Sequence, residues 1–237
     1  MELPGLTARD VSRTTTHTRH HASVLAAAER WILIWLAARM PRCVTSDGLT
    51  LMGAAGMLGV ACAFSAASAS RTWLALVPVC LAVNWFGDSL DGTLARVRQA
   101  QRPRYGYYLD HVVDLVNTVL LFGGLGLSGI ATPIVAGGLL AGYLLLAAES
   151  FLATHAVGVF RISFGWFGPT ELRILLSIGA LVAIGRPVVM PFGLGRILLW
   201  DVGGLCGIVG MVTVFGINAV RNARALAADD PLPGGAA

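Results

Sequence analysis

The sequence has no lysine and little charge of either sign. Charged residues make up 13% of its 237 positions, about half of the share found in soluble domains. Hydrophobic residues make up 56%, and the mean hydropathy is +0.72. The net charge of +4 rests on 17 arginines that are spread along the chain. This composition excludes an ordinary soluble domain, argues against a nucleic-acid partner, and predicts a chain that resides in a membrane.

Cysteine is scarce as well, and no C-x-x-C spacing occurs, so neither a disulfide framework nor a zinc site is predicted. The four cysteines are Cys43, Cys62, Cys80 and Cys206. Residues 1–22 lack the apolar core of a signal peptide, and we interpret them as a cytoplasmic N-terminal arm. The tail 225–237 is small, polar and rich in proline and glycine, which predicts disorder.

Long apolar runs are what the sequence does contain. A membrane-spanning helix needs about 20 mostly apolar residues, because the hydrocarbon core is about 30 Å thick. The charge-free run 115–148 is too long for one span, and we divide it at the glycine-rich segment before Pro133. The sequence therefore predicts an all-α integral membrane protein with one membrane domain, 23–224, and six transmembrane helices at 48–70, 72–96, 106–129, 131–155, 170–185 and 202–220.

A further helix is predicted at 23–42, ahead of the spans. Its stripe of Trp31, Ile32, Trp35 and Leu36 is flanked by charged residues on both sides. This pattern indicates an N-terminal interfacial amphipathic helix that lies along the membrane. The alternative is a short helix packed on its neighbours.

Arginines are distributed unequally between the two ends of the predicted spans. Fourteen lie on the side of the N-terminus, and three lie on the other side: Arg71, Arg186 and Arg196. Because arginine-rich loops stay in the cytoplasm, we expect a multi-pass protein of the cell membrane with both termini on the cytoplasmic side.

Four aspartates gather near the cytoplasmic ends of the second and third spans. Asp88 and Asp91 are three residues apart, and Asp110 and Asp114 are four apart, so each pair shares one face of its helix. Four neighbouring carboxylates would repel one another unless cations neutralised them. Oxygen ligands select hard ions, so the aspartates predict a site for Mg²⁺ or Mn²⁺.

Small residues accompany these aspartates on the same helix faces. Gly92 and Ala95 follow the first pair, and Gly106 precedes the second, which would leave room for a ligand. The alternative is that the carboxylates only form ion pairs with the neighbouring arginines, which are Arg96, Arg98, Arg102 and Arg104.

The order and spacing of these residues resemble the signature of the CDP-alcohol phosphotransferase (CDP-alcohol phosphatidyltransferase) family. The match reads Asp88-x2-Asp91-Gly92-x2-Ala95-Arg96-x9-Gly106-x3-Asp110-x3-Asp114, with one loop residue more than in many members. The resemblance implies six membrane helices, often in a homodimer, and an enzyme in which an alcohol hydroxyl displaces CMP from a CDP-linked alcohol. It also implies a two-metal site of Mg²⁺ or Mn²⁺ at Asp88, Asp91, Asp110 and Asp114, with Asp114 as general base.

The resemblance further implies residues that bind the CDP-alcohol. Gly92 and Ala95 would admit the nucleotide between helices, and Arg96 would meet a phosphate. The segment TSDGLTLMG is similar to the family's first-span entrance, although a helix cap at Ser46 or Asp47 is the alternative for it. The expected set is Asp47, Gly48, Thr50, Gly92, Ala95, Arg96, Arg102 and Gly106.

Residues for the acceptor alcohol are less constrained by the sequence. Arg161, Arg173 and Arg221 fall at cytoplasmic ends of spans and could bind a phosphate or carboxylate, but they could also serve only to orient the protein. Glu149, inside the fourth span, is expected to form a helix-to-helix hydrogen bond, with binding of acceptor hydroxyls as the alternative.

Residues and resemblance together predict a phospholipid-synthesising transferase. It would move a phosphatidyl group from CDP-diacylglycerol, or a similar CDP-alcohol, to inositol, inositol phosphate or glycerol phosphate. Two other interpretations stay open. A membrane prenyltransferase would need a second Asp-rich segment about half a chain away, and a divalent-cation transporter would carry its site nearer the middle of the membrane.

Overall fold

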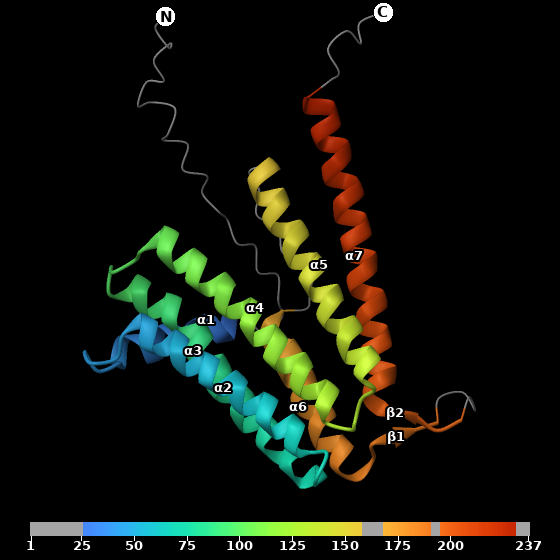
Figure 1. Cartoon of the computed structure of the whole chain (residues 1–237). Coiled ribbons are helices and arrows are strands. Elements are labelled where there is room, and N and C mark those ends of the chain that lie inside the picture. The colour runs from blue at the N-terminus through green and yellow to red at the C-terminus, as the bar shows by residue number, and fades with distance from the viewer. Residues whose placement is uncertain (1–25, 158–167, 191–194, 231–237) are drawn as a thin grey trace, which may run out of the picture.

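The computed structural model describes residues 26–157, 168–190 and 195–230. Figure 1 shows long helices that run up and down, with a small hairpin at one end. In chain order the elements are α1 (Ala26–Arg39), α2 (Ser46–Ala66), the 3₁₀ helix η1 (Arg71–Leu76), α3 (Val77–Val97), α4 (Pro103–Leu127), α5 (Pro133–Val157), α6 (Pro169–Gly185), β1 (Val188–Val189), β2 (Ile197–Leu198) and α7 (Leu199–Asp229).

The starts of the helices follow from local sequence signals. Proline stands in the first turn of α3, α4, α5 and α6, where its missing N–H is not needed. The side chain of Thr45 caps α2 by accepting a hydrogen bond from the Gly48 N–H at 3.1 Å. The cap predicted in this segment therefore exists, but Thr45 provides it rather than Ser46 or Asp47.

Five helices in the described part of the chain are long and apolar enough to cross a membrane: Ser46–Ala66, Arg71–Val97, Pro103–Leu127, Pro133–Ala156 and Leu199–Asp229. The remaining predicted span, 170–185, is α6, which has 17 residues. The prediction of an all-α membrane protein is confirmed.

Two features differ from the sequence prediction. Val188–Val189 and Ile197–Leu198 form a two-stranded antiparallel sheet, in which Val188 pairs with Leu198. In addition, α7 continues to Asp229 and so includes the first residues of the tail that was predicted to be disordered. The run ARALAA explains this second error, because alanine, leucine and arginine are strong helix formers. Residues 231–237, like the predicted arm 1–22, lie outside the described part.

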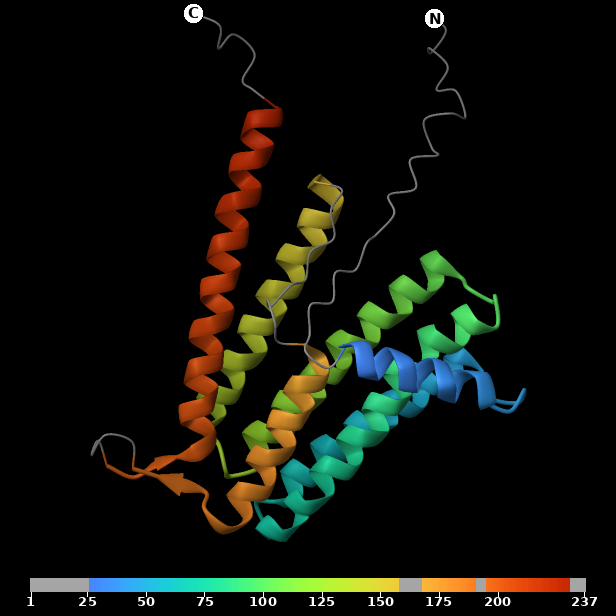
Figure 2. The ribbon, with the colours of Figure 1, turned by 180° about the vertical axis from the view of Figure 1, so that it is seen from behind.

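The N-terminal helix α1 packs on the bundle through one face and leaves another exposed. Leu33 and Ala37 are buried against α2 and α3, whereas Trp31 is 69% exposed and Trp35 is 45% exposed. Figure 2 shows α1 crossing the bundle with its first residues beside the start of α6. The packed-helix alternative is therefore correct for one face, and contact of the tryptophan face with a membrane surface stays a prediction.

Glycines bring α2 and α3 into close contact. A Cβ added at Gly87 would lie 2.4 Å from the Gly53 backbone nitrogen, and one at Gly56 would lie 2.6 Å from the Asn84 backbone nitrogen. Small residues permit this approach in membrane helices generally. The close packing fixes α3, and with it Asp88 and Asp91, against α2.

Replacing Gly87 with alanine is expected to destabilise the protein by about 1–3 kcal/mol or more, because the new methyl group would overlap backbone atoms of α2. Gly123→Ala is the matched control, since a Cβ at that position of α4 meets nothing within 4 Å. Thermal unfolding in detergent measures both variants. An equal melting temperature for the two would contradict the packing argument.

Polar contacts join α5 to α7, which run side by side in both views (Figures 1 and 2). Asn222 donates a hydrogen bond to Glu149 at 2.7 Å, which confirms the predicted helix-to-helix bond of Glu149. At the other end, Asp201 accepts hydrogen bonds from the Thr132 N–H and hydroxyl at 2.7 and 3.2 Å. These contacts hold α5 and α7 together at both ends.

Candidate active site

Three of the four signature aspartates lie together where the C-terminal part of α3 meets the N-terminal part of α4. Asp88, Asp110 and Asp114 are half-buried, and one carboxylate oxygen of each lies within 4.8 Å of the others. An octahedral Mg²⁺ separates its ligand oxygens by up to about 4.2 Å. Small side-chain movements therefore suffice for these carboxylates to share a hard divalent cation.

Asp91 has different partners. Its carboxylate accepts a hydrogen bond from the Thr50 hydroxyl at 2.6 Å and another from the Gly92 N–H, and its backbone carbonyl accepts one from the Ser46 hydroxyl at 2.6 Å. Asp91 is still close enough to Asp88 and Asp110 to interact with their charges. The structure thus connects Asp91, predicted as a metal ligand, to Thr50, predicted as a nucleotide contact.

Arg173 is the predicted acceptor residue that reaches the aspartates. From the first turns of α6, its Nη2 donates to Asp88 in a half-buried ion pair, and its Nε donates to the Asn84 Oδ1 at 2.9 Å. The Asn84 amide in turn donates to the Gly53 carbonyl at 2.9 Å. A guanidinium is therefore fixed beside the carboxylates, as recognition of an anionic group requires.

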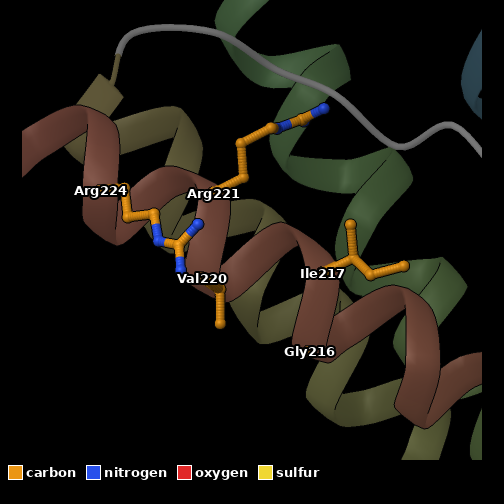
Figure 3. Close-up of a pocket in the computed structure, with 5 residues that line it drawn as sticks. All are labelled: Gly216, Ile217, Val220, Arg221 and Arg224. Carbon is orange, nitrogen blue, oxygen red and sulfur yellow. The ribbon is translucent and has the colours of Figure 1, made fainter.

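The other two acceptor candidates lie elsewhere. Arg161 is outside the described residues. Arg221 is exposed on α7 and lines a shallow pocket with Gly216, Ile217, Val220 and Arg224, all from the same helix (Figure 3). Among the described residues, the structure brings Arg173 and not Arg221 into contact with the aspartates.

Two of the predicted nucleotide contacts, Asp47 and Arg102, bind each other. Arg102 donates two hydrogen bonds to the Asp47 carboxylate at 2.6 and 2.7 Å and lies over the Tyr105 ring. The bonded Asp47 carboxylate raises the pKa of the Arg102 guanidinium, although both side chains are about half exposed. An exposed pair of this kind adds little stability, so it can open to admit a phosphate.

The predicted small residues differ in what surrounds them. A Cβ at Gly106 would have nothing within 4 Å, and one at Gly92 would meet only the tip of Arg96, at 3.6 Å. Arg96 is exposed and donates to Thr93 at 3.0 Å. Ala95, which lies between Gly92 and Arg96 in the sequence of α3, is partly exposed. At Gly48, by contrast, a Cβ would approach the Thr45 hydroxyl to 3.0 Å, so capping of α2 already accounts for this glycine.

Sequence reasoning did not select two residues that face the site. Asn84 is 1% exposed and joins α2, α3 and α6; its spacing of four residues from Asp88 is the signal that could have found it. Tyr143 of α5 lies beside Thr118 and is close enough to the three clustered aspartates to interact with their charges. No spacing rule connects Tyr143 to a motif on another helix.

The family profile described as CDP-alcohol phosphatidyltransferase matches residues 43–209. A comparison with curated proteins finds no match.

Among solved structures, the chain is similar to a phosphatidylinositol phosphate synthase from Mycobacterium tuberculosis, crystallised with CDP-DAG bound. The TM-score is 0.56 and the identity 23%, over 87% of this chain and 98% of that one. At this identity the likeness shows the shared fold, and the family follows from the profile. Because that profile covers more than half of the sequence and includes every signature position, the chain belongs to the CDP-alcohol phosphatidyltransferase family.

Proposed function

We propose that the protein transfers a phosphatidyl group from CDP-diacylglycerol to the hydroxyl of a polar alcohol and releases CMP. The observation that carries the proposal is the group of Asp88, Asp110 and Asp114 with the guanidinium of Arg173 beside it. Carboxylates suit a divalent cation and a guanidinium suits a phosphate, so the site pairs a metal centre with an anion-binding group.

The carboxylates have distinct proposed roles. Asp88, Asp91 and Asp110 are metal ligands, and Asp114 is partly a ligand and the general base. Two ions, Mg²⁺ or Mn²⁺, would supply neutralisation of the pyrophosphate and of the leaving phosphate. Asp114 accepts the proton of the acceptor hydroxyl while the hydroxyl oxygen bonds to the phosphorus of the phosphatidyl group and the bond from that phosphorus to CMP breaks.

The remaining residues bind the two substrates. We assign the CDP moiety to Asp47, Thr50, Arg96 and Arg102, of which Thr50 bonds to Asp91 and Arg102 bonds to Asp47. We assign the acceptor to Arg173, whose guanidinium favours an acceptor that carries a phosphate. Inositol phosphate is the first acceptor to test, because the similar crystal structure is of a phosphatidylinositol phosphate synthase; glycerol phosphate and inositol follow.

Orientation and assembly complete the proposal. The excess of arginine on the side of the aspartates favours a cytoplasmic active site with both termini on the same side. A homodimer in the bilayer is proposed because members of the family are often dimeric. The mass of the purified protein in detergent tests it.

The decisive experiment is a CMP-release assay. Purified protein in lipid nanodiscs receives CDP-diacylglycerol, Mn²⁺ or Mg²⁺ and one acceptor at a time: inositol phosphate, glycerol phosphate or inositol. We expect CMP to form with at least one acceptor, and most rapidly with one that bears a phosphate. Reactions without acceptor measure hydrolysis as background. A folded sample that releases no CMP above this background with any of the three acceptors contradicts the proposal.

A further inference from the structure

The N-terminal helix α1 contains a carboxylate that binds two other helices at once. Oε1 of Glu29 accepts hydrogen bonds from Trp85 Nε1 at 2.7 Å, from the Thr170 hydroxyl at 2.8 Å and from the Ser89 hydroxyl at 3.5 Å. Trp85 and Ser89 belong to α3, and Thr170 belongs to the first turn of α6. Charge-assisted hydrogen bonds of this kind are stronger than those between neutral groups.

The partners of Glu29 are next to the residues that join α3 to α6 inside the site. On α3, Trp85 precedes Asp88 by three residues and Ser89 follows it directly. On α6, Thr170 precedes Arg173 by three residues, so the two lie on the same face of the helix. Glu29 therefore clamps the same pair of helices one turn away from the Asp88–Arg173 ion pair.

We infer that Glu29 is a positioning residue that acts on the active site through Arg173. By holding the first turn of α6 against α3, it fixes the guanidinium of Arg173 on Asp88 and Asn84. Figure 2 shows the arrangement that makes this possible, since the start of α1 lies beside the start of α6. The inference rests on the proposed function in taking the clustered carboxylates as metal ligands.

The consequence is a measurable link between α1 and metal affinity. A guanidinium bound to Asp88 competes with a cation for the same carboxylate, because like charges at short range repel. Removal of the guanidinium in Arg173→Ala should therefore tighten Mn²⁺ binding, roughly 10-fold for a partly exposed pair. Displacement of Arg173 by Glu29→Ala should change the affinity in the same direction by a smaller factor.

The test measures Mn²⁺ binding to the full-length protein in detergent, from the electron paramagnetic resonance signal of free Mn²⁺. Glu29→Gln removes the charge of Glu29 but keeps an oxygen that can accept the two shorter hydrogen bonds, from Trp85 and Thr170, and it should bind Mn²⁺ within about twofold of the wild type. Glu29→Ala should bind it more tightly, and Thr170→Val is a milder variant that should act in the same direction. Glu149→Ala is the matched control, because it breaks an interhelical hydrogen bond of equal length between α5 and α7.

The double variant Glu29→Ala with Arg173→Ala decides whether Glu29 acts through Arg173. If it does, the double variant binds Mn²⁺ as Arg173→Ala alone does, because the guanidinium that Glu29 positions is already gone. Three results would overturn the inference. The first is that adding Glu29→Ala to Arg173→Ala changes the Mn²⁺ affinity as much as it does in the wild type. The others are that Glu29→Ala and Glu29→Gln bind Mn²⁺ equally, or that Arg173→Ala leaves the Mn²⁺ affinity unchanged. This measurement needs no turnover, so a failure to release CMP would defeat the proposed function and leave this result standing.

Discussion

Asp114→Asn should reduce CMP release by about 10²–10⁴-fold, which is the range that general-base catalysis contributes. Asparagine is close to aspartate in size but cannot accept the proton of the acceptor hydroxyl at neutral pH. The substitution leaves Thr50, Arg96 and Arg102, which are proposed to bind the CDP moiety, unchanged. We therefore expect binding of the CDP-alcohol to be largely retained, as measured with a radiolabelled donor in the absence of acceptor.

The control for Asp114→Asn is Asp201→Asn. Asp201 is a buried aspartate that binds Thr132 at the opposite end of the bundle from the signature. Its variant should keep turnover within about an order of magnitude of the wild type, with a lower melting temperature from the weakened contact. Near-normal turnover by Asp114→Asn would refute the role of Asp114 as base.

Helical spacing predicts that all four signature aspartates meet, and the structure brings Asp88, Asp110 and Asp114 together while Asp91 bonds to Thr50. Asp110 and Asp114 are one turn apart on one helix, and a short loop connects that helix to the one that carries Asp88. The inference succeeds for these three because it depends on local periodicity and on one tight connection between neighbouring helices.

Contacts between helices that are distant in the sequence could not be predicted in this way. Arg173 is 85 residues from Asp88, and Thr170 is 141 residues from Glu29. Nothing in a single sequence fixes the rotation of α6 or the course of α1 across the bundle. The hydrogen bond between Asp91 and Thr50 could not be predicted either, because it depends on how closely glycines allow α2 to approach α3.

Chelation of divalent cations with EDTA should abolish CMP release, and Mn²⁺ should restore it. Mn²⁺ should also stabilise the wild-type protein, because a ligand that binds only the folded state adds about 2.7 kcal/mol at 100 times its dissociation constant. Asp110→Asn should lose most of this stabilisation, since it removes one of the three clustered carboxylates. Asp230→Asn, at the exposed end of α7, is the control and should retain it. Equal Mn²⁺-induced shifts in melting temperature for the two variants would contradict a metal site at the cluster.

Asp91→Asn then tests whether the fourth signature aspartate is a metal ligand as well. Its carboxylate is held by Thr50 and by the Gly92 N–H, so ligation requires an oxygen that remains available or an exchange of the Thr50 bond. As a ligand, Asp91 should contribute to the Mn²⁺-induced shift as Asp110 does, and Asp91→Asn should reduce it similarly. A shift in Asp91→Asn equal to that of Asp230→Asn would instead restrict Asp91 to anchoring α3 on α2, and Asp88, Asp110 and Asp114 would then hold the metal alone.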